Sequence, residues 1–481
     1  MRKICITLLI VMVIFTAILF TAAQQEKVTI TVWDHMLAQS KYYDQEIKLF
    51  MEKYPWIEVQ RVKQVHYRYK TLIELAARGN KLPDLYYPRV VGNIIDDIEQ
   101  GWAVPLDKWA TPEWKKRFPK GSFVEGIHTF MGKTYTIPFS KPYVWHQLYI
   151  NRKVFREAGL VDKKGKVLRP RTWEEYYKFA KIISEKGKGK VWGVGIASKP
   201  EHLFPHAYYE WARWAGAAGG DHVERFEMDY RVGRYTFDHP AYVKVFKLLL
   251  KMKRDGCIYP QFLSVDDETL KVMFADGKIG MIEGGIWNQT GWQVTNPGWL
   301  DYDCVPEPPP DKRGYRGMQN VIAEASCYLM SRDCKHPEEA WLFLDWLTSF
   351  EAGVRYAKSG NGLSIYPEAN IGNNNTEQFN QYVEICNKFL RWAPNPVARN
   401  PALAKIKLEV PTPSKEAIFW GIMSGTIKEE DIPRTLKEMN DRYNAELEKG
   451  IKKLQAEGYK VSMKDLVFPD WNPMENYEPK E

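Results

Sequence analysis

A tryptophan that closely follows two adjacent glycines is the clearest candidate for ligand chemistry in this sequence. The segment reads Met281-Ile-Glu-Gly-Gly-Ile-Trp-Asn288. Glycine tolerates backbone angles that other residues resist, so the chain can turn sharply here and approach another surface closely. Trp287 then offers a broad apolar ring with one polar N–H, which suits stacking against a ligand. We predict that Trp287 contacts a ligand; the alternative is a ring that packs between parts of the protein.

Further candidates come from residues that follow predicted strands, from a helix and from turns. Open α/β sheets bind ligands outside the carboxyl ends of their strands. Carboxylates accept hydrogen bonds from hydroxyl groups, although Asp34 has the alternative of capping the next helix. Besides Trp287, the predicted ligand-binding residues are Asp34, His35, Tyr87, Tyr143, Trp145, Tyr209, Glu210, Trp211, Asn288, Asn320 and Asn361.

The sequence contains few motifs that would indicate catalysis, metal binding or a cofactor. The chain has no Gly-x-Ser-x-Gly, His-Glu-x-x-His or Gly-x-x-x-x-Gly-Lys-Ser/Thr pattern. His202 and His206 have the spacing of metal ligands, but Pro205 between them interrupts a helical face. We therefore predict no catalytic residues, no metal and no cofactor.

Alternating strand and helix patterns would position the candidates. Residues 28–33 and 57–62 alternate like strands, residues 83–87 form a third short strand, and residues 41–54 and 69–78 have apolar positions at helical spacing. This order is typical of a parallel sheet with covering helices. With 481 residues the chain exceeds what one core supports, so we expect two lobes.

The N-terminus has the pattern of a secretory signal, with Arg2 and Lys3 before an apolar run and small residues up to Ala23. The alternative is an uncut membrane anchor. The net charge of +8 is dispersed and does not indicate a nucleic-acid partner. Five cysteines follow the signal, an odd number, and among them Cys327 and Cys334 could form a disulfide.

Several motifs, in their order along the chain, resemble the extracellular solute-binding proteins of ABC transporters, specifically the maltose-binding-protein-like sugar binders. They are Gly101-Trp-Ala-Val-Pro-Leu-Asp107, Gly132-Lys-Thr-Tyr-Thr-Ile-Pro-Phe139, Leu148-Tyr-Ile-Asn-Arg-Lys-Val-Phe155, Pro170-Arg-Thr-Trp-Glu-Glu175, the segment ending at Asn288, and Lys335-His-Pro-Glu-Glu-Ala-Trp341. In that family a stacking aromatic commonly ends the motif that here ends at Trp287.

The resemblance implies an α/β, two-lobed type II periplasmic-binding-protein fold, with a helix-flanked sheet in each lobe and hinge crossovers between them. It places a signal peptide at 1–23, one lobe at 24–140 plus about 321–358, and the other at about 146–319 plus 362–481. Relative to shorter members of that family, residues 221–235 are predicted to be an insertion.

The implied function is an exported component of an ABC importer that binds an oligosaccharide between closing lobes and delivers it to membrane permease subunits. We expect a monomer that is not an enzyme, located in the periplasm or outside the cell. The alternative is a secreted carbohydrate-active enzyme, a glycoside hydrolase or lyase, with an aromatic-lined cleft.

Overall fold

The structure, a computed structural model, describes residues 27–89, 94–199, 206–219, 227–311, 319–321, 326–370 and 376–478. The predicted signal peptide at 1–23, the first part of the predicted insertion and His202 lie outside these residues.

The N-terminal lobe is built on a four-stranded sheet in the order β13-β3-β1-β2. Strand β1 (Val28–Asp34) pairs in parallel with β2 (Ile57–Lys63) and with β3 (Leu85–Tyr86), while β13 (Leu329–Met330) returns antiparallel at the edge. The strands and helices predicted between residues 28 and 87 are therefore confirmed. The flanking helices are α2 (Ser40–Lys53), α3 (His66–Arg78), α4 (Ile95–Glu99), α5 (Pro112–Lys115), α12 (Pro337–Leu347) and α13 (Phe350–Lys358).

The C-terminal lobe is built on a second four-stranded sheet in the order β11-β6-β10-β7. Strands β7 (Trp192–Gly195) and β10 (Ile279–Gly284) are parallel neighbours, and β6 (Gln147–Asn151) runs antiparallel to β10 and to β11 (Tyr302–Val305). Its helices are α6 (Arg152–Glu157), α7 (Trp173–Gly187), α8 (His206–Trp214), α9 (Pro240–Arg254), α10 (Asp267–Ala275), α11 (Ile286–Thr295), α14 (Glu377–Phe389), α15 (Pro396–Arg399), α16 (Lys415–Ser424) and α17 (Ile432–Ala456).

Short elements complete the described chain. Three two-stranded sheets pair β4 (Thr129–Phe130) with β5 (Lys133–Thr134), β8 (Met228–Asp229) with β9 (Arg234–Tyr235), and β12 (Gln319–Val321) with β14 (Leu390–Trp392). Single turns of 3₁₀ helix are η2 (Pro367–Asn370), η3 (Pro401–Lys405), η4 (Glu429–Asp431) and η5 (Met463–Leu466).

Chain segments that cross between the lobes lie side by side. The first crossing forms single β-bridges from Pro138 to Ser326 and from Ser140 to Ser364. Lys141 N also donates to the carbonyl of Leu363 at 2.9 Å. Each lobe has its own buried apolar cluster, and the N-terminal one draws on residues from 30–139 and 327–369. The predicted two-lobed fold with hinge crossovers is confirmed.

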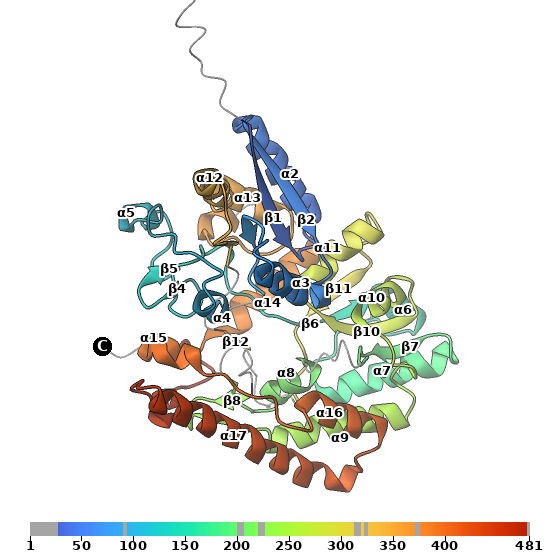
Figure 1. The fold of residues 1–481 in the computed structure, drawn as a ribbon. Helices are drawn as coiled ribbons and strands as arrows, with labels where there is room; N and C mark the ends of the chain where they lie inside the picture. The colour runs from blue at the N-terminus through green and yellow to red at the C-terminus, as the bar shows by residue number, and fades with distance from the viewer. Residues whose placement is uncertain are drawn as a thin grey trace, which may run out of the picture.

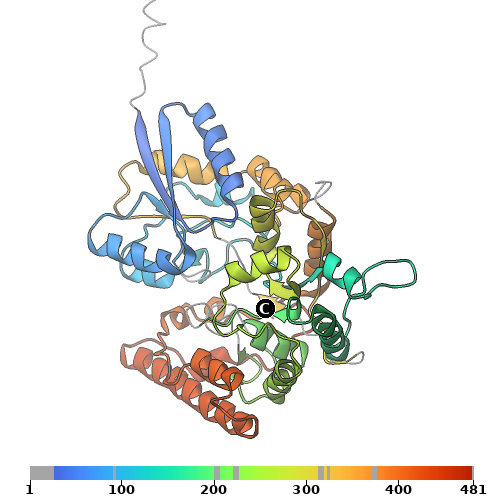
Figure 2. The ribbon, with the colours of Figure 1, turned by 90° about the vertical axis from the view of Figure 1, so that its right-hand side faces the viewer.

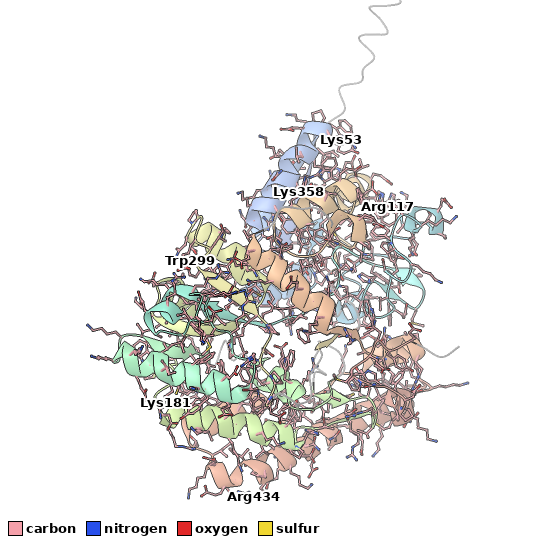
Figure 3. All side chains as sticks on the ribbon, turned by 180° about the vertical axis from the view of Figure 1, so that it is seen from behind. Lys53, Arg117, Lys181, Trp299, Lys358 and Arg434 are labelled. Carbon is pink, nitrogen blue, oxygen red and sulfur yellow. The ribbon has the colours of Figure 1, made fainter. Side chains whose placement is uncertain are left out.

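The two lobes are separated along the long dimension of the molecule. Figures 1 and 2 both place the sheet of β1 and β2 at one end and helix α17 at the other. In the view from behind, Lys53 marks the first end and Arg434 the second (Figure 3). None of the five cysteines after Cys5 takes part in a disulfide, so the bridge that the sequence allows between Cys327 and Cys334 is not formed.

Candidate ligand-binding site

A small pocket lies where two parallel strands of the C-terminal lobe end. Gly195, the last residue of β7, and Gly284, the last residue of β10, both line a cavity of about 40 Å³. His146, directly before the antiparallel strand β6, reaches the same edge of the sheet. This is the edge at which open α/β sheets bind ligands. The aromatic and titratable members of the lining are His146, Tyr176, Trp211, Asp267, Glu283 and Trp287.

Gly284 and Gly285 cannot carry a larger side chain, because neighbouring side chains occupy the space that a Cβ atom would need. A Cβ atom on Gly285 would lie 2.2 Å from the indole ring of Trp287, and one on Gly284 would lie 2.0 Å from the amide nitrogen of Asn288. Gly285 caps helix α11 with a φ of −90°, and neither glycine adopts the left-handed conformation. The predicted close approach is thus present, but the expected unusual backbone angles are not. The side chains of Trp287 and Asn288 fold back over the two glycines that precede them.

Aromatic rings form much of the pocket wall. The Trp287 ring stands nearly perpendicular to the rings of His146 (5.5 Å between centroids, 89°) and Trp145 (6.4 Å, 84°). On another part of the wall, Trp211 packs against Tyr176 with ring centroids 4.8 Å apart. Trp287 is partly exposed, so its indole is available to a ligand in a way that a fully buried ring is not.

Carboxylates lie among these rings. Glu210 of α8 accepts a hydrogen bond from His146 Nδ1 at 3.0 Å, and the indole N–H of Trp211 donates to Glu283. Asp267 forms an ion pair with Lys271 at 2.7 Å on α10. The pocket therefore combines flat apolar surfaces with hydrogen-bond acceptors, which is the chemistry that polyhydroxylated ligands need.

Burial and mutual repulsion shift the titration of these groups. Burial, with the negative charge of Glu210 beside it, raises the pKa of Glu283 to about 8, against the opposing effects of His146 and the Trp211 indole. Burial and the charges of Glu210 and Glu283 also raise the pKa of Glu307 well above its ordinary value. For His146, burial lowers the pKa, but the ion pair with Glu210 outweighs it and leaves the pKa raised.

Five of the predicted ligand-binding residues lie at or beside this pocket. Trp287 and Trp211 line it, Glu210 holds the imidazole of His146, and Trp145 contacts the Trp287 ring. Asn288 is fully buried and lies behind Gly284.

Three others from the C-terminal lobe and the crossing segments are placed elsewhere. Tyr209 has no exposed surface and belongs to the core of this lobe. Tyr143 packs at the edge of a second cluster there. Asn361 is buried and donates to Ser359 Oγ at 2.7 Å.

The N-terminal candidates form a separate group, and the outcome for Asp34 differs from expectation. The Asp34 carboxylate is fully buried and accepts two hydrogen bonds from Arg61, one from Tyr328 Oη and one from Met36 N. These four hydrogen bonds occupy the lone pairs of the carboxylate, so no acceptor position is left for a hydroxyl group of a ligand. His35 packs edge-on against Tyr69 and Tyr87 at ring-centroid distances of 5.1 and 5.3 Å.

Asn320 sits in β12, opposite Arg391, and its side chain lies outside the described residues.

Among the aromatic and titratable residues of the lining, sequence reasoning missed four: His146, Tyr176, Asp267 and Glu283. A usable signal existed for two of them. Glu283 stands directly before the paired glycines at the end of a strand, and His146 follows Trp145. Asp267 and Tyr176 lie on helices whose contact with the pocket only the packing decides.

The described residues contain neither a metal-binding cluster nor a membrane-spanning helix. No group of three or more His, Cys, Asp or Glu side chains is arranged to hold a metal ion there. None of the helices described combines the length and apolar character that crossing a bilayer requires.

The fold and pocket define a two-lobed solute-binding protein. A family model described as bacterial extracellular solute-binding protein matches residues 35–354, well over half of the chain. The chain therefore belongs to this family, whose members are exported proteins that bind substrates.

Known relatives agree with this assignment. A protein of Brucella abortus (strain 2308), named as a binding protein, is 26% identical over 364 residues, which cover 73% of this chain and 79% of that one. An ABC substrate-binding protein of Listeria monocytogenes, solved with cycloalternan, has a TM-score of 0.64 at 18% identity and covers 88% of this chain and 99% of its own. The maltotriose-bound maltose/maltodextrin-binding domain of Bdellovibrio bacteriovorus has a TM-score of 0.63 at 17% identity, with 86% and 99% covered.

Proposed function

We propose that this protein binds an oligosaccharide between its two lobes and delivers it to the permease subunits of an ABC importer. The observation that carries the proposal is the pocket at the ends of β7 and β10, where the Trp287 and Trp211 rings stand beside Glu283. Aromatic rings stack on the C–H faces of sugars, while the carboxylate accepts hydrogen bonds from hydroxyl groups. The sugars named for the structural relatives add support by analogy.

Delivery follows from lobe movement. A ligand that contacts both lobes binds the closed arrangement better than the open one, and that difference in affinity shifts the population. The surface offered to a permease changes with closure, so the transporter can favour loaded protein. The proposal also includes a monomer with no nucleic-acid partner and no catalytic activity, exported through a signal peptide at 1–23. The lobe limits are those that the sequence predicts, except that Tyr366 and Ala369 pack in the N-terminal core.

A thermal-unfolding screen tests the function. Malto-, cello-, manno- and xylo-oligosaccharides and their monosaccharides would each be added to pure protein. A ligand at about one hundred times its dissociation constant stabilises the folded state by roughly 2.7 kcal/mol, which shifts the transition visibly. No shift with any sugar contradicts the proposal. Analysis of the bound sugar after long incubation separates binding from hydrolysis, because an enzyme would return shortened or modified chains.

The Trp287→Ala variant locates the site. Loss of the stacking ring should weaken sugar binding by more than tenfold, or about 1.4 kcal/mol, as measured by calorimetry. Trp56→Ala is the matched control, since Trp56 packs edge-on against Tyr54 in the N-terminal lobe at 5.5 Å and lies outside the pocket lining. Equal affinity in folded Trp287→Ala would mean that the site lies elsewhere.

A further inference from the structure

Among the described residues, two carboxylates in this region take part in no ion pair: Glu283, which lines the pocket and is partly exposed, and Glu307, which is buried. Asp267 is paired with Lys271, and Glu210 with His146. Among the residues that the structure describes, no Lys, Arg or His nitrogen forms an ion pair with Glu283 or Glu307. Glu307 is 2% exposed, and neither of its carboxylate oxygens has a hydrogen-bond partner. The acidic side chains here exceed the cations that could neutralise them.

An ionised carboxylate removed from water without a partner is strongly unfavourable, so its charge must be balanced by a proton or by a cation. In the empty protein the proton does so: burial raises the pKa of Glu283 to about 8 and that of Glu307 well above the ordinary range. A ligand that brings its own positive charge can replace the proton.

The aromatic rings around Glu283 also favour a cation. Trp211, Tyr176, His146 and Trp287 line the same pocket. The faces of Trp and Tyr rings attract cations through their quadrupoles, most strongly when water is excluded. Aromatic walls and a carboxylate that has no ion-pair partner together are the recognition chemistry of a protonated nitrogen.

We propose that the pocket takes a sugar bearing a protonated amine, an amino-sugar unit of an oligosaccharide, whose ammonium group becomes the counter-ion of Glu283. The inference rests on the proposed function and narrows its substrate class. A neutral sugar would donate hydroxyl hydrogens but would leave Glu283 protonated, so it would gain no ion pair with this carboxylate. An anionic sugar would compete for cations that are already paired, His146 with Glu210 and Lys271 with Asp267.

Matched sugars provide the test. Calorimetry would compare glucosamine, galactosamine and mannosamine, and glucosamine oligomers, with their glucose, galactose, mannose and cello-oligosaccharide counterparts, which carry a hydroxyl in place of the amine. The expected result is at least tenfold tighter binding of an amino member than of its neutral match. If a neutral oligosaccharide binds as tightly as its amino counterpart, or only neutral sugars bind, the inference is wrong and the proposed function stands. If no sugar of either kind binds, both fail.

The Glu283→Gln variant tests whether Glu283 is the residue that pairs with the ammonium group of the ligand. Glutamine has the shape of the protonated acid, so the variant should fold and should lose at least tenfold in affinity for the amino sugar. Glu185→Gln on the exposed surface of α7 is the matched control and should bind like the parent protein. Independently of any variant, calorimetry in buffers of different ionisation enthalpy should detect proton release on binding at pH 7. Binding without proton release would contradict the replacement of a proton by the ligand's ammonium group.

Discussion

At the residue scale, Gly285 controls where the Trp287 ring can lie. The indole occupies the space that a side chain on Gly285 would need, with 2.2 Å between the two positions. Gly291, inside helix α11, is a contrasting case, because a Cβ there meets no atom within 4 Å. Gly285 caps the helix that contains Gly291, and the two glycines differ in what surrounds them.

Substitution by alanine should therefore have opposite effects at these positions. Gly285→Ala must displace a large rigid ring, and we expect a loss of about 1–3 kcal/mol in the free energy of unfolding together with weaker sugar binding. Gly291→Ala should raise the free energy of unfolding by about 0.5–1 kcal/mol, because alanine favours a helix interior over glycine. Chemical denaturation measures both. Equal stability of Gly285→Ala and the parent protein would show that the ring does not need this space.

Glu283 should make the stability of the empty protein depend on pH. Its pKa is about 8 when folded and near 4.5 when exposed, so the folded state holds an extra proton between these values. The stability that this group contributes is complete below about pH 4.5 and is lost as the pH rises through 8. Relative to Glu283→Gln, the free energy of unfolding of the parent should fall from pH 5 to pH 8.5. Parallel pH profiles of the two proteins would contradict the shifted pKa.

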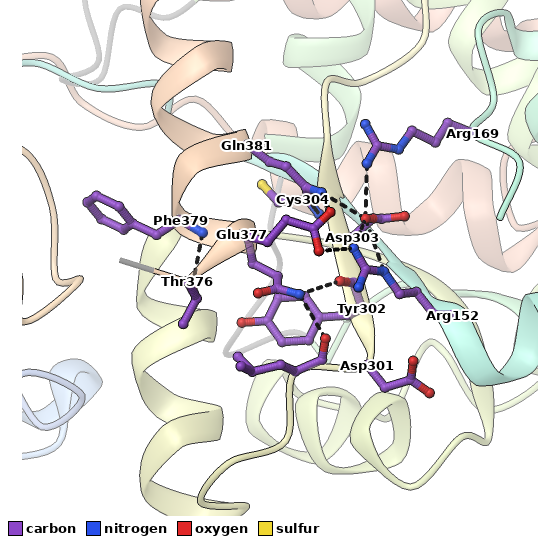
Figure 4. A network of polar contacts seen from close by, with 12 residues as sticks. Arg152, Arg169, Asp301, Tyr302, Asp303, Cys304, Thr376, Glu377, Phe379 and Gln381 are labelled. Atoms are coloured by element: carbon purple, nitrogen blue, oxygen red, sulfur yellow. Dashed lines mark hydrogen bonds and ion pairs between the residues drawn. The ribbon is translucent and has the colours of Figure 1, made fainter. Parts of the chain in front are cut away.

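At the element scale, Asp303 joins three segments of the C-terminal lobe. This buried residue of β11 accepts hydrogen bonds from Arg152 of α6, from Arg169 before α7 and from Gln381 of α14 (Figure 4). Burial raises the pKa of Asp303, but its bonds to Arg152 and Gln381 outweigh that effect and leave it below the ordinary value. One carboxylate thus fixes the strand that edges the sheet to two covering helices.

The Asp303→Asn variant should lose about 2 kcal/mol of folding free energy at pH 7, because charge-assisted hydrogen bonds are replaced by weaker ones. A lowered carboxylate pKa stabilises the protein above about pH 4, and this contribution disappears as the pH falls through the folded value. The difference between parent and variant should therefore shrink in acid. Denaturation at pH 7 and at pH 3.5 tests this; a difference that stays constant would rule out the carboxylate charge as its source.

At the scale of the whole molecule, a strap of residues 395–407 contacts both lobes. Leu403 packs in the C-terminal core, while Ala404 packs against the N-terminal one. Lys405 forms an ion pair with Glu99, and Lys407 pairs with Asp96 at 3.2 Å. Both acids belong to α4 of the N-terminal lobe. The strap therefore links the lobes through charges that are partly open to solvent.

Removing both lysines should lower the free energy of unfolding by about 1 kcal/mol, the range of partly exposed ion pairs, and the loss should diminish at high salt. The matched control is Lys437→Ala, whose exposed pair with Asp441 lies within the single helix α17. Thermal unfolding of Lys405→Ala/Lys407→Ala at low and at high salt measures the effect. A loss that salt does not change would mean that the lysines act through packing rather than charge.

Much of the architecture could be read from the chain. The elements between residues 28 and 87 follow from short-range periodicity, since alternation specifies a strand and helical spacing specifies a helix. Gly284, Gly285 and Trp287 were recognisable for a similar reason. Their contacts lie within four residues, so the sequence itself displays the constraint.

The site as a whole depends on partners that are distant in sequence. His146 and Glu210 are 64 residues apart, and Asp34 meets Tyr328 across 294 residues. No local pattern could indicate that Asp34 would be saturated by Arg61 and Tyr328, or that Glu283 would be left without a cation. The sequence by itself determined the elements between residues 28 and 87 and the position of Trp287 beside the two glycines, because those depend on near neighbours. Only the tertiary structure decided which charges are paired, because burial and pairing arise when distant strands and helices pack together.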